Sequence, residues 1–239
     1  MLYIVGTPIG NLDDISERCA RTLREVDLIA AEDTRHSLRL LQRLELSKPM
    51  ISYHEHNEAG RTPELIQKLQ QGTNIALITD AGMPSISDPG RRLIAACIEA
   101  QLSYTVIPGP SAVLVALTGS GFQNDQWSFS GFLPNKSGQR ERILADACET
   151  GDTAIFFESP HRITKTLAVL AQIAPTRRVC VARELTKQFE EFRVGLAADL
   201  LSHYEAHPAK GEITLLIDGF NRQEVKDQKR AERDARHDY

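Results

Sequence analysis

Hydrophobic residues in the first half of the chain fall into short runs, separated by longer segments in which apolar residues recur at helical spacing. The runs predict strands at residues 2–5, 27–31, 50–53, 74–79 and 104–107. The segments between them predict helices that begin near residue 13, at 34–44, at 62–71, at 88–100 and after the turn at 108–110. Strands that alternate with helices are typical of βα units and a mostly parallel sheet.

The second half has a different order of elements. Its apolar runs predict strands at 127–131, 153–157, 178–183, 189–194 and 213–218, with helices near 140–148, 163–173 and 197–203. The strands on either side of residue 185 follow one another without a helix, which indicates antiparallel pairing in a mixed sheet. We therefore expect two α/β domains, at residues 1–121 and 122–218, followed by a polar charged tail at 219–239.

Composition narrows the class of protein. A content of 41% hydrophobic and 25% charged residues is ordinary for a globular protein, and a formal net charge of −4 argues against a general nucleic-acid coat while leaving room for a local basic face. The four cysteines form no C-x-x-C pair, so we expect neither a zinc site nor a disulfide framework. No apolar stretch approaches the roughly 20 residues of a membrane span, and we expect a cytoplasmic protein.

Three loops that follow predicted strands combine glycine with proline: VGTPIGN (5–11), TDAGMPSISDPG (79–90) and IPGPSAVL (107–114). Ligands of open α/β sheets bind beyond the carboxyl ends of strands, where these loops lie. Glycine permits close approach of a backbone to a ligand, and proline stiffens the loop. Each loop taken singly also fits a plain tight turn, but three together favour a ligand site.

The familiar nucleotide motifs are absent. No G-x-G-x-x-G follows the first strand, and SGFLPNKSG (130–138) has Asn135 where a phosphate loop requires glycine. The three loops also contain little lysine. A neutral or cationic ligand fits better, since Asp80 can accept hydrogen bonds from a ribose or an amino group, and this points toward a sulfonium cofactor.

The segments VGTPIGNLDDIS, AEDTRHS, TDAGMPSISDPG, VIPGPSAVLVAL, SGFLP, FFESPHRI and GEITLLIDG, in that order, resemble the tetrapyrrole-methylase-fold (class III) methyltransferases across about residues 1–218. They are most similar to the branch that acts on small-subunit ribosomal RNA. Relatives in that branch usually continue past the last strand into a further helical region, whereas this chain ends 21 residues after Asp218.

The resemblance implies S-adenosylmethionine bound between two α/β domains, methyl transfer to a cytidine 2′-hydroxyl of 16S ribosomal RNA, and a homodimer. By motif position it implies cofactor contacts, mostly through the backbone, at Pro8, Asp80, Ala81, Gly82, Met83, Ser111, Ala112, Phe157, Ile213 and Thr214. Alternatives on the same fold are methylation of a tetrapyrrole or of a protein side chain. A nucleotide-binding module is the alternative from another class.

A ribose hydroxyl is a poor nucleophile, so we expect charged side chains near the acceptor. We hypothesise that Asp33, Arg35 and Glu184 form the catalytic and orienting set, although capping of a helix by Asp33 explains that residue equally well. His54 and His56 flank Glu55 in SYHEHNE and suit RNA contact or a base role better than a metal site, and we expect no metal.

Basic residues suggest where RNA is held. Lys136 and Arg140 lie on a Gly/Ser-rich connection, and Arg162 follows a strand of the second domain in a position to hold a phosphate. A second group is the arginine stripe of the first domain, Arg18, Arg21, Arg24, Arg39 and Arg43. Charged runs of this kind are often only solvated faces.

Overall fold

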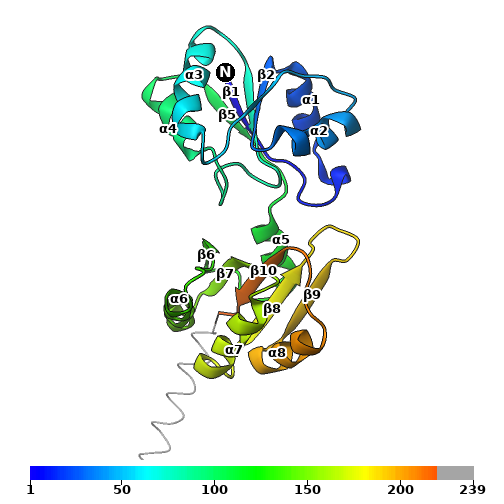
Figure 1. The fold of residues 1–239 in the computed structure, drawn as a ribbon, viewed down its shortest axis with the longest axis vertical. Coiled ribbons are helices and arrows are strands. Elements are labelled where there is room, and N and C mark those ends of the chain that lie inside the picture. The colour runs from blue at the N-terminus through cyan, green and yellow to red at the C-terminus, as the bar shows by residue number, and fades with distance from the viewer. Residues whose placement is uncertain (220–239) are drawn as a thin grey trace, which may run out of the picture. The chain divides into compact units, whose positions relative to one another are not determined.

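The computed structural model describes residues 1–219 and divides the chain into two compact units (Figure 1). The first unit is Met1–Ala112, and the second begins at Val113. Residues 220–239 lie outside the described part. The polar charged tail expected at 219–239 therefore lies almost wholly outside it too. In residues 1–219 no helix has the length and apolar character needed to cross a membrane.

The first unit is a parallel sheet covered by helices on both faces. Its strands are β1 (Leu2–Val5), β2 (Leu28–Ala31), β3 (Met50–Ser52), β4 (Ile75–Ile78) and β5 (Tyr104–Ile107), arranged in the order β3-β2-β4-β1-β5. Every pairing among them is parallel. A 3₁₀ turn (Leu12–Asp14) precedes helices α1 (Glu17–Glu25), α2 (Thr34–Arg43), α3 (Glu58–Gln70) and α4 (Arg91–Glu99).

Alternate residues of the central strands supply two separate cores. Val5, Ala76 and Ile78 pack with residues of α1 and α2, while Ile4 and Leu77 pack with residues of α3 and α4. Figure 1 shows these two helix pairs on opposite sides of the sheet. The runs LYIV and IALI are apolar throughout because both of their faces are covered.

The second unit is a mixed sheet. Its strands are β6 (Trp127–Phe132), β7 (Thr153–Glu158), β8 (Arg178–Arg183), β9 (Glu191–Leu196) and β10 (Ile213–Ile217), arranged in the order β6-β7-β10-β8-β9. Only β6 and β7 are parallel; β10 runs antiparallel to both of its neighbours. The helices are α5 (Ala112–Ser120), α6 (Ser137–Thr150), α7 (Ile163–Ile173) and α8 (Ala197–Ala206). Both sheets agree with the predicted classes.

Helix α5 explains why the units divide at Ala112 and not after Gly121, where the sequence placed the boundary. Helices α6, α7 and α8 pack through Leu144, Leu167 and Leu200 on one face of the second sheet. On the other face a Cβ added to Gly119 of α5 would lie 2.3 Å from the ring of Phe192 in β9. This close approach places α5 with the second unit.

The structure corrects one predicted helix. The sequence placed the start of α3 at Thr62, with Pro63 in the first turn, but α3 begins at Glu58 and contains Pro63 in its interior. The carbonyl of Asn57 accepts the N–H groups of Gly60 and Arg61 and so starts the helix earlier. The rule that proline opens a helix fails here because an upstream asparagine already supplies the start.

Candidate functional site

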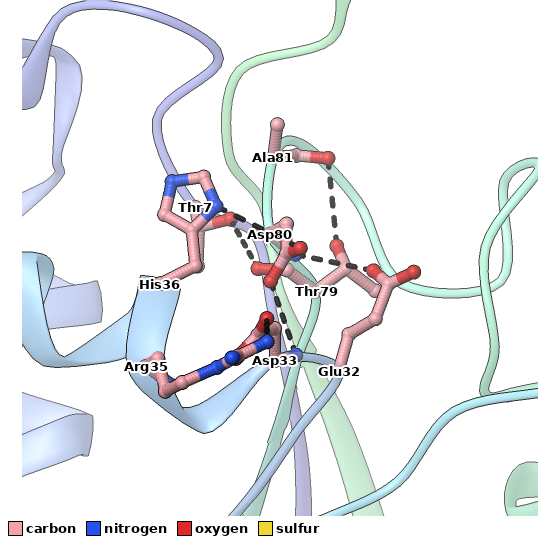
Figure 2. Close-up of polar contacts among 8 residues, drawn as sticks. All are labelled: Thr7, Glu32, Asp33, Arg35, His36, Thr79, Asp80 and Ala81. Atoms are coloured by element: carbon pink, nitrogen blue, oxygen red, sulfur yellow. Dashed lines mark hydrogen bonds and ion pairs between the residues drawn. The ribbon is translucent and has the colours of Figure 1, made fainter.

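The parallel strands of the first unit bring four loops to one edge of its sheet. The carboxyl ends of β1, β2, β4 and β5 lead into residues 6–11, 32–36, 79–90 and 108–112. Figure 2 shows side chains from the first three of these loops directed toward one another. Open α/β sheets bind ligands at this edge, and we call these four loops together the loop edge.

A two-residue bridge fixes the loop after β1 against the loop after β4. The N–H of Thr7 donates to the carbonyl of Gly82 at 2.9 Å, and the N–H of Gly82 donates to the carbonyl of Thr7 at 3.1 Å. The Thr7 hydroxyl also donates to the carbonyl of Thr79 at 3.1 Å (Figure 2). Gly82 has a φ of +82°, which favours glycine. The two loops are therefore held together without a ligand.

The loop after β5 joins them through glycines. A Cβ on Gly6 would lie 2.5 Å from the Sδ of Met83 and 2.7 Å from the Cα of Gly109. No larger residue fits at Gly6 or Gly109 without movement of the backbone. Three chain segments thus converge where the sequence predicted close backbone approach.

Asp80 lies at the centre of the polar network in Figure 2. Its Oδ1 accepts the N–H of Asp33 at 3.2 Å, and its Oδ2 lies 3.6 Å from Nδ1 of His36. Its own N–H donates to Oε2 of Glu32 at 3.3 Å. Because Asp33 caps the start of α2, the Asp80 carboxylate faces a helix N-terminus, which stabilises negative charge.

Asp88 is a functional candidate that the sequence analysis did not select, since it was taken only as the start of a helix. Burial, with the neighbouring charges of Glu32 and Asp80, raises the pKa of Asp88 to about 7. Burial also raises the pKa of Glu32; the hydrogen bond from the N–H of Asp80 opposes this shift, while the charge of Asp80 adds to it. The loop edge is therefore rich in carboxylate and backbone oxygen, a set of acceptors that suits a cation and repels a phosphate.

Asp33 and Arg35 lie together. Oδ1 of Asp33 accepts the N–H of Arg35 at 2.8 Å, and the Arg35 guanidinium returns to the same carboxylate through Nη2 at 2.9 Å. Hydrogen bonds from Arg35 lower the pKa of Asp33 to about 2. The Arg35 side chain remains 88% exposed. Asp33 is thus a helix cap that stays charged at neutral pH.

Glu184, the third residue of the hypothesised catalytic set, belongs to the second unit. Its Oε1 accepts Nζ of Lys187 at 2.9 Å and the N–H of Glu212 at 3.0 Å. Burial raises its pKa, but these hydrogen bonds outweigh that effect and the pKa of Glu184 is lowered overall. A Cβ on Gly211 would lie 2.2 Å from the Glu184 carboxylate, so the glycine at 211 leaves the space that this side chain occupies.

Two of the three residues expected to contact RNA already form hydrogen bonds or ion pairs within the second unit. Arg162 pairs with the buried Glu158 at 2.7 Å and also donates to the carbonyl of Leu133 and to the side chain of Asn135. Arg140 is buried, and its Nη1 donates to the carbonyls of Pro134 and Asn135 at 3.4 and 3.5 Å. The structure thus gives both arginines a role in holding the loop at 133–136.

Lys136 is the exposed member of this group and precedes the first turn of α6. Contact of Lys136, Arg140 and Arg162 with RNA stays a prediction, and only Lys136 has its charge at the surface. The arginines of α1, Arg18, Arg21 and Arg24, are exposed as expected.

The predicted histidines lie just after β3. The amide of Asn57 donates to Nε2 of His54 at 3.0 Å, and the His54 and His56 rings meet edge to face at 6.0 Å. His54 contributes to the electrostatic environment of Glu32, which places it beside the carboxylates of the loop edge. A catalytic or RNA-binding role for either histidine stays a prediction.

The remaining predicted cofactor contacts divide between the two units. Pro8 is buried, and Ser111 and Ala112 are half-buried at the start of α5. In the second unit Phe157 of β7 lies opposite Thr214 of β10. The Ile213 side chain belongs to the core beneath α6, α7 and α8, so only its backbone is available to a ligand. Contact of these residues with a cofactor stays a prediction.

Solved structures share the fold of this chain. A crystal structure of the methyltransferase CobJ is similar to it with a TM-score of 0.68 and 18% identity, covering 91% of this chain and 93% of that one. A crystal structure of diphthine synthase gives a TM-score of 0.70 at 13% identity, covering 91% and 90%. At such identities the likeness shows the fold alone.

Sequence relatives define the family. The family of Tetrapyrrole (Corrin/Porphyrin) Methylases matches residues 1–201. A Synechocystis protein named Ribosomal RNA small subunit methyltransferase I is 47% identical over 92% of this chain and 79% of its own length. A Thermotoga maritima protein of the same name is 43% identical over 91% of this chain and 98% of its own length. The chain belongs to the tetrapyrrole methylase family, within the group that carries this name, and is therefore a methyltransferase.

Proposed function

We propose that this chain uses S-adenosylmethionine to methylate the 2′-hydroxyl of a cytidine in 16S ribosomal RNA of the small subunit. The observation that carries the proposal is the 43–47% identity, over more than nine tenths of the chain, to proteins named Ribosomal RNA small subunit methyltransferase I. We propose in addition that the chain acts in the cytoplasm and as a homodimer.

The loop edge of the first unit fits this cofactor. S-adenosylmethionine carries a sulfonium and an amino group, both cationic, and the carboxyl groups of Glu32, Asp80 and Asp88 supply acceptor oxygens at these loops. The glycines of the three loops allow their backbones to approach a bound molecule closely. In the first unit the proposed contacts are Pro8, Asp80, Ala81, Gly82, Met83, Ser111 and Ala112. In the second unit they are Phe157, Ile213 and Thr214.

When bound, the cofactor supplies a methyl group on a positively charged sulfur, which is already a strong electrophile. The residues of the chain then have to hold the acceptor hydroxyl in line, and positioning of this kind supplies roughly 7–11 kcal/mol in favourable cases. We propose that Asp33, Arg35 and Glu184 contribute by orienting charged groups. A carboxylate with a low pKa is a weak proton acceptor, so orientation suits Asp33 and Glu184 better than proton removal.

Nucleoside mass spectrometry tests the proposal. Small-subunit ribosomal RNA is compared between cells that have the gene, cells that lack it, and cells supplied again with the wild-type chain or the Asp33→Ala/Arg35→Ala/Glu184→Ala variant. We expect 2′-O-methylated cytidine to vanish without the gene and to return only with the wild-type chain. A mark that persists without the gene would direct the search to tetrapyrrole or protein substrates, and full rescue by the triple variant would remove those residues from the mechanism.

Binding measurements separate the cofactor classes. Isothermal titration with S-adenosylmethionine and with ATP is expected to give saturable heat for the first alone, because the loop edge carries carboxylates where a triphosphate requires cations. Saturable ATP binding would favour the nucleotide-binding alternative.

A further inference from the structure

The second unit contains a cavity that the proposed reaction does not use. It has a volume of about 300 Å³ and lies where β8 ends and β9 begins, against the last turn of α8. The residues that matter for its chemistry are Arg183, Glu191, His203, Tyr204, His207 and Lys210.

The acidic group of this cavity is already neutralised. One oxygen of Glu191 accepts Nε of Arg183 at 3.1 Å, and the other accepts Nε of Arg193 at 2.8 Å. The hydroxyl of Tyr204 lies 3.5 Å from the same carboxylate. Arg183 also donates to the carbonyl of Lys210 at 3.0 Å, which ties the segment after α8 to the end of β8. The wall is therefore preformed and internally paired.

Positive charge remains after this pairing. Among the residues that line the cavity, Arg183 and Lys210 carry two positive charges and Glu191 carries one negative charge, and Arg193, which pairs with Glu191 from outside the lining, adds a third positive charge. Lys210 is exposed, and no contact of its ammonium group is described within residues 1–219. In a chain with a net charge of −4, a local excess of this kind marks a place for an anion.

The two histidines add a flat hydrogen-bonding surface beside the lysine. Their rings stack with centroids 4.8 Å apart and planes 22° from parallel. Nδ1 of His207 lies 3.2 Å from the carbonyl of His203, and because a carbonyl only accepts, Nδ1 carries the hydrogen. Nε2 of the exposed His207 ring is left free, and it can donate a hydrogen bond to an anion when the ring is protonated.

We propose that this cavity binds a backbone phosphate of the RNA substrate, with the Lys210 ammonium and the His207 ring as its contacts. The inference rests on the proposed function, because it is the RNA substrate that supplies the phosphate. Complementary charge and donors on a preformed wall are the properties that position nucleic acid without reading its sequence.

Methylation kinetics on small subunits, purified from a strain that lacks the gene, test the inference. Lys210→Ala and His207→Ala are each expected to raise KM about tenfold with kcat unchanged, since the first loses a charged contact to the substrate and the second loses a hydrogen-bond donor. Binding of labelled small-subunit ribosomal RNA is followed by fluorescence anisotropy at several salt concentrations. The negative slope of log K against log salt is expected to be less steep by about 1 for Lys210→Ala than for wild type. Lys210→Arg is expected to keep the wild-type slope.

Lys165→Ala is the matched control, since Lys165 is an exposed lysine on α7 of the same unit. Thermal unfolding verifies that each variant is folded. If wild-type chain methylates the subunits and Lys210→Ala and His207→Ala behave like Lys165→Ala, the cavity is not an RNA site, while the proposed function stands. If the wild-type chain neither methylates nor binds the RNA, both proposals fail together.

Inorganic phosphate, added at constant ionic strength, distinguishes a free anion from the RNA backbone. Competition by phosphate that is lost in Lys210→Ala, together with weaker RNA binding by that variant, supports the inference. Phosphate binding with unchanged RNA affinity in the variant would overturn it.

Discussion

The carboxyl group of Asp88 has a pKa of about 7 instead of the ordinary 3.8, because burial and the nearby Glu32 and Asp80 disfavour its charged form. A group whose pKa is raised by folding weakens the folded state as the pH rises from the unfolded value through the folded one. Asp88→Asn is therefore expected to raise the melting temperature relative to wild type at about pH 8, with the difference vanishing at about pH 4. Equal differences at both pH values would contradict the assignment.

Ligand binding should also act on this group. A cation bound beside the cluster favours the charged form of Asp88, so binding releases a proton and the affinity for S-adenosylmethionine is expected to rise between about pH 6 and pH 8. The increase is less than tenfold per pH unit because a single proton is involved. Titration calorimetry in buffers of different ionisation enthalpy measures the release, and Asp88→Asn is expected to abolish it.

Gly211 gives a second test at the level of single residues. It has a φ of +80°, and a Cβ there would overlap the Glu184 carboxylate. Gly211→Ala is expected to lower the free energy of unfolding by about 2 kcal/mol or more, from backbone strain and overpacking together. Urea unfolding provides the measurement.

Gly72 is the matched control for that substitution, since its φ is +90° and a Cβ there would meet nothing within 4 Å. Gly72→Ala reports strain alone, and the difference between the two variants reports the overlap. In a Glu184→Ala background the overlap should disappear. Equal losses at Gly72 and Gly211 would show that the Glu184 side chain yields freely.

At the level of elements, helix α3 carries an internal defect. Pro63 is exposed, lies in the sixth position of the helix, and lacks the N–H that would bond to the carbonyl of Ala59. Pro63→Ala is expected to stabilise the protein by about 1–2 kcal/mol, because the helical gain exceeds the lost rigidity of the unfolded chain. Pro175→Ala, in the exposed loop after α7, is expected to have the opposite sign. Thermal unfolding compares the two, and a loss of stability at Pro63 would contradict this account.

Strands were predictable from the sequence because burial on both faces leaves apolar runs such as Ile75–Ile78 with polar residues on either side. The start of α3 was not predictable from Pro63, because the hydrogen bonds of Asn57 determine it. The unit boundary also escaped prediction. It depends on the contact between Gly119 and Phe192, which are far apart in the chain.

The loop edge was predictable from its glycines, its prolines and Asp80. The raised pKa of Asp88 was not, since it depends on burial in the folded chain and on Glu32, which is distant in the sequence, as well as on Asp80. The same limit applies to Arg140 and Arg162. From the sequence alone, a basic residue is interpreted as a surface charge, because its buried partner is not visible there. For Arg162 that partner is Glu158.

At the level of the whole molecule, the two units have separate sheets and cores, but the second depends on its last strand. β10 lies in the middle of the second sheet and pairs with β7 and β8. A chain cut after Glu212 is expected to lose protection from hydrogen exchange throughout the second unit, while β1, β2 and β4 remain protected. Mass spectrometry of exchanged peptides makes the comparison, and protection retained in β7 and β8 would contradict it.

The central place of β10 matters most while the chain is being translated. The first sheet is complete once Ile107 has been made, but the second stays open at its centre until Ile217, 110 residues later. At synthesis rates of about 5–20 residues per second this interval lasts roughly 5–20 s. β7 is complete at Glu158 and β8 at Arg183, so in the later part of this interval each presents an unpaired edge, and such edges readily join strands of other chains. We therefore expect the nascent chain to be most prone to association with other chains between the completion of β7 and the completion of β10.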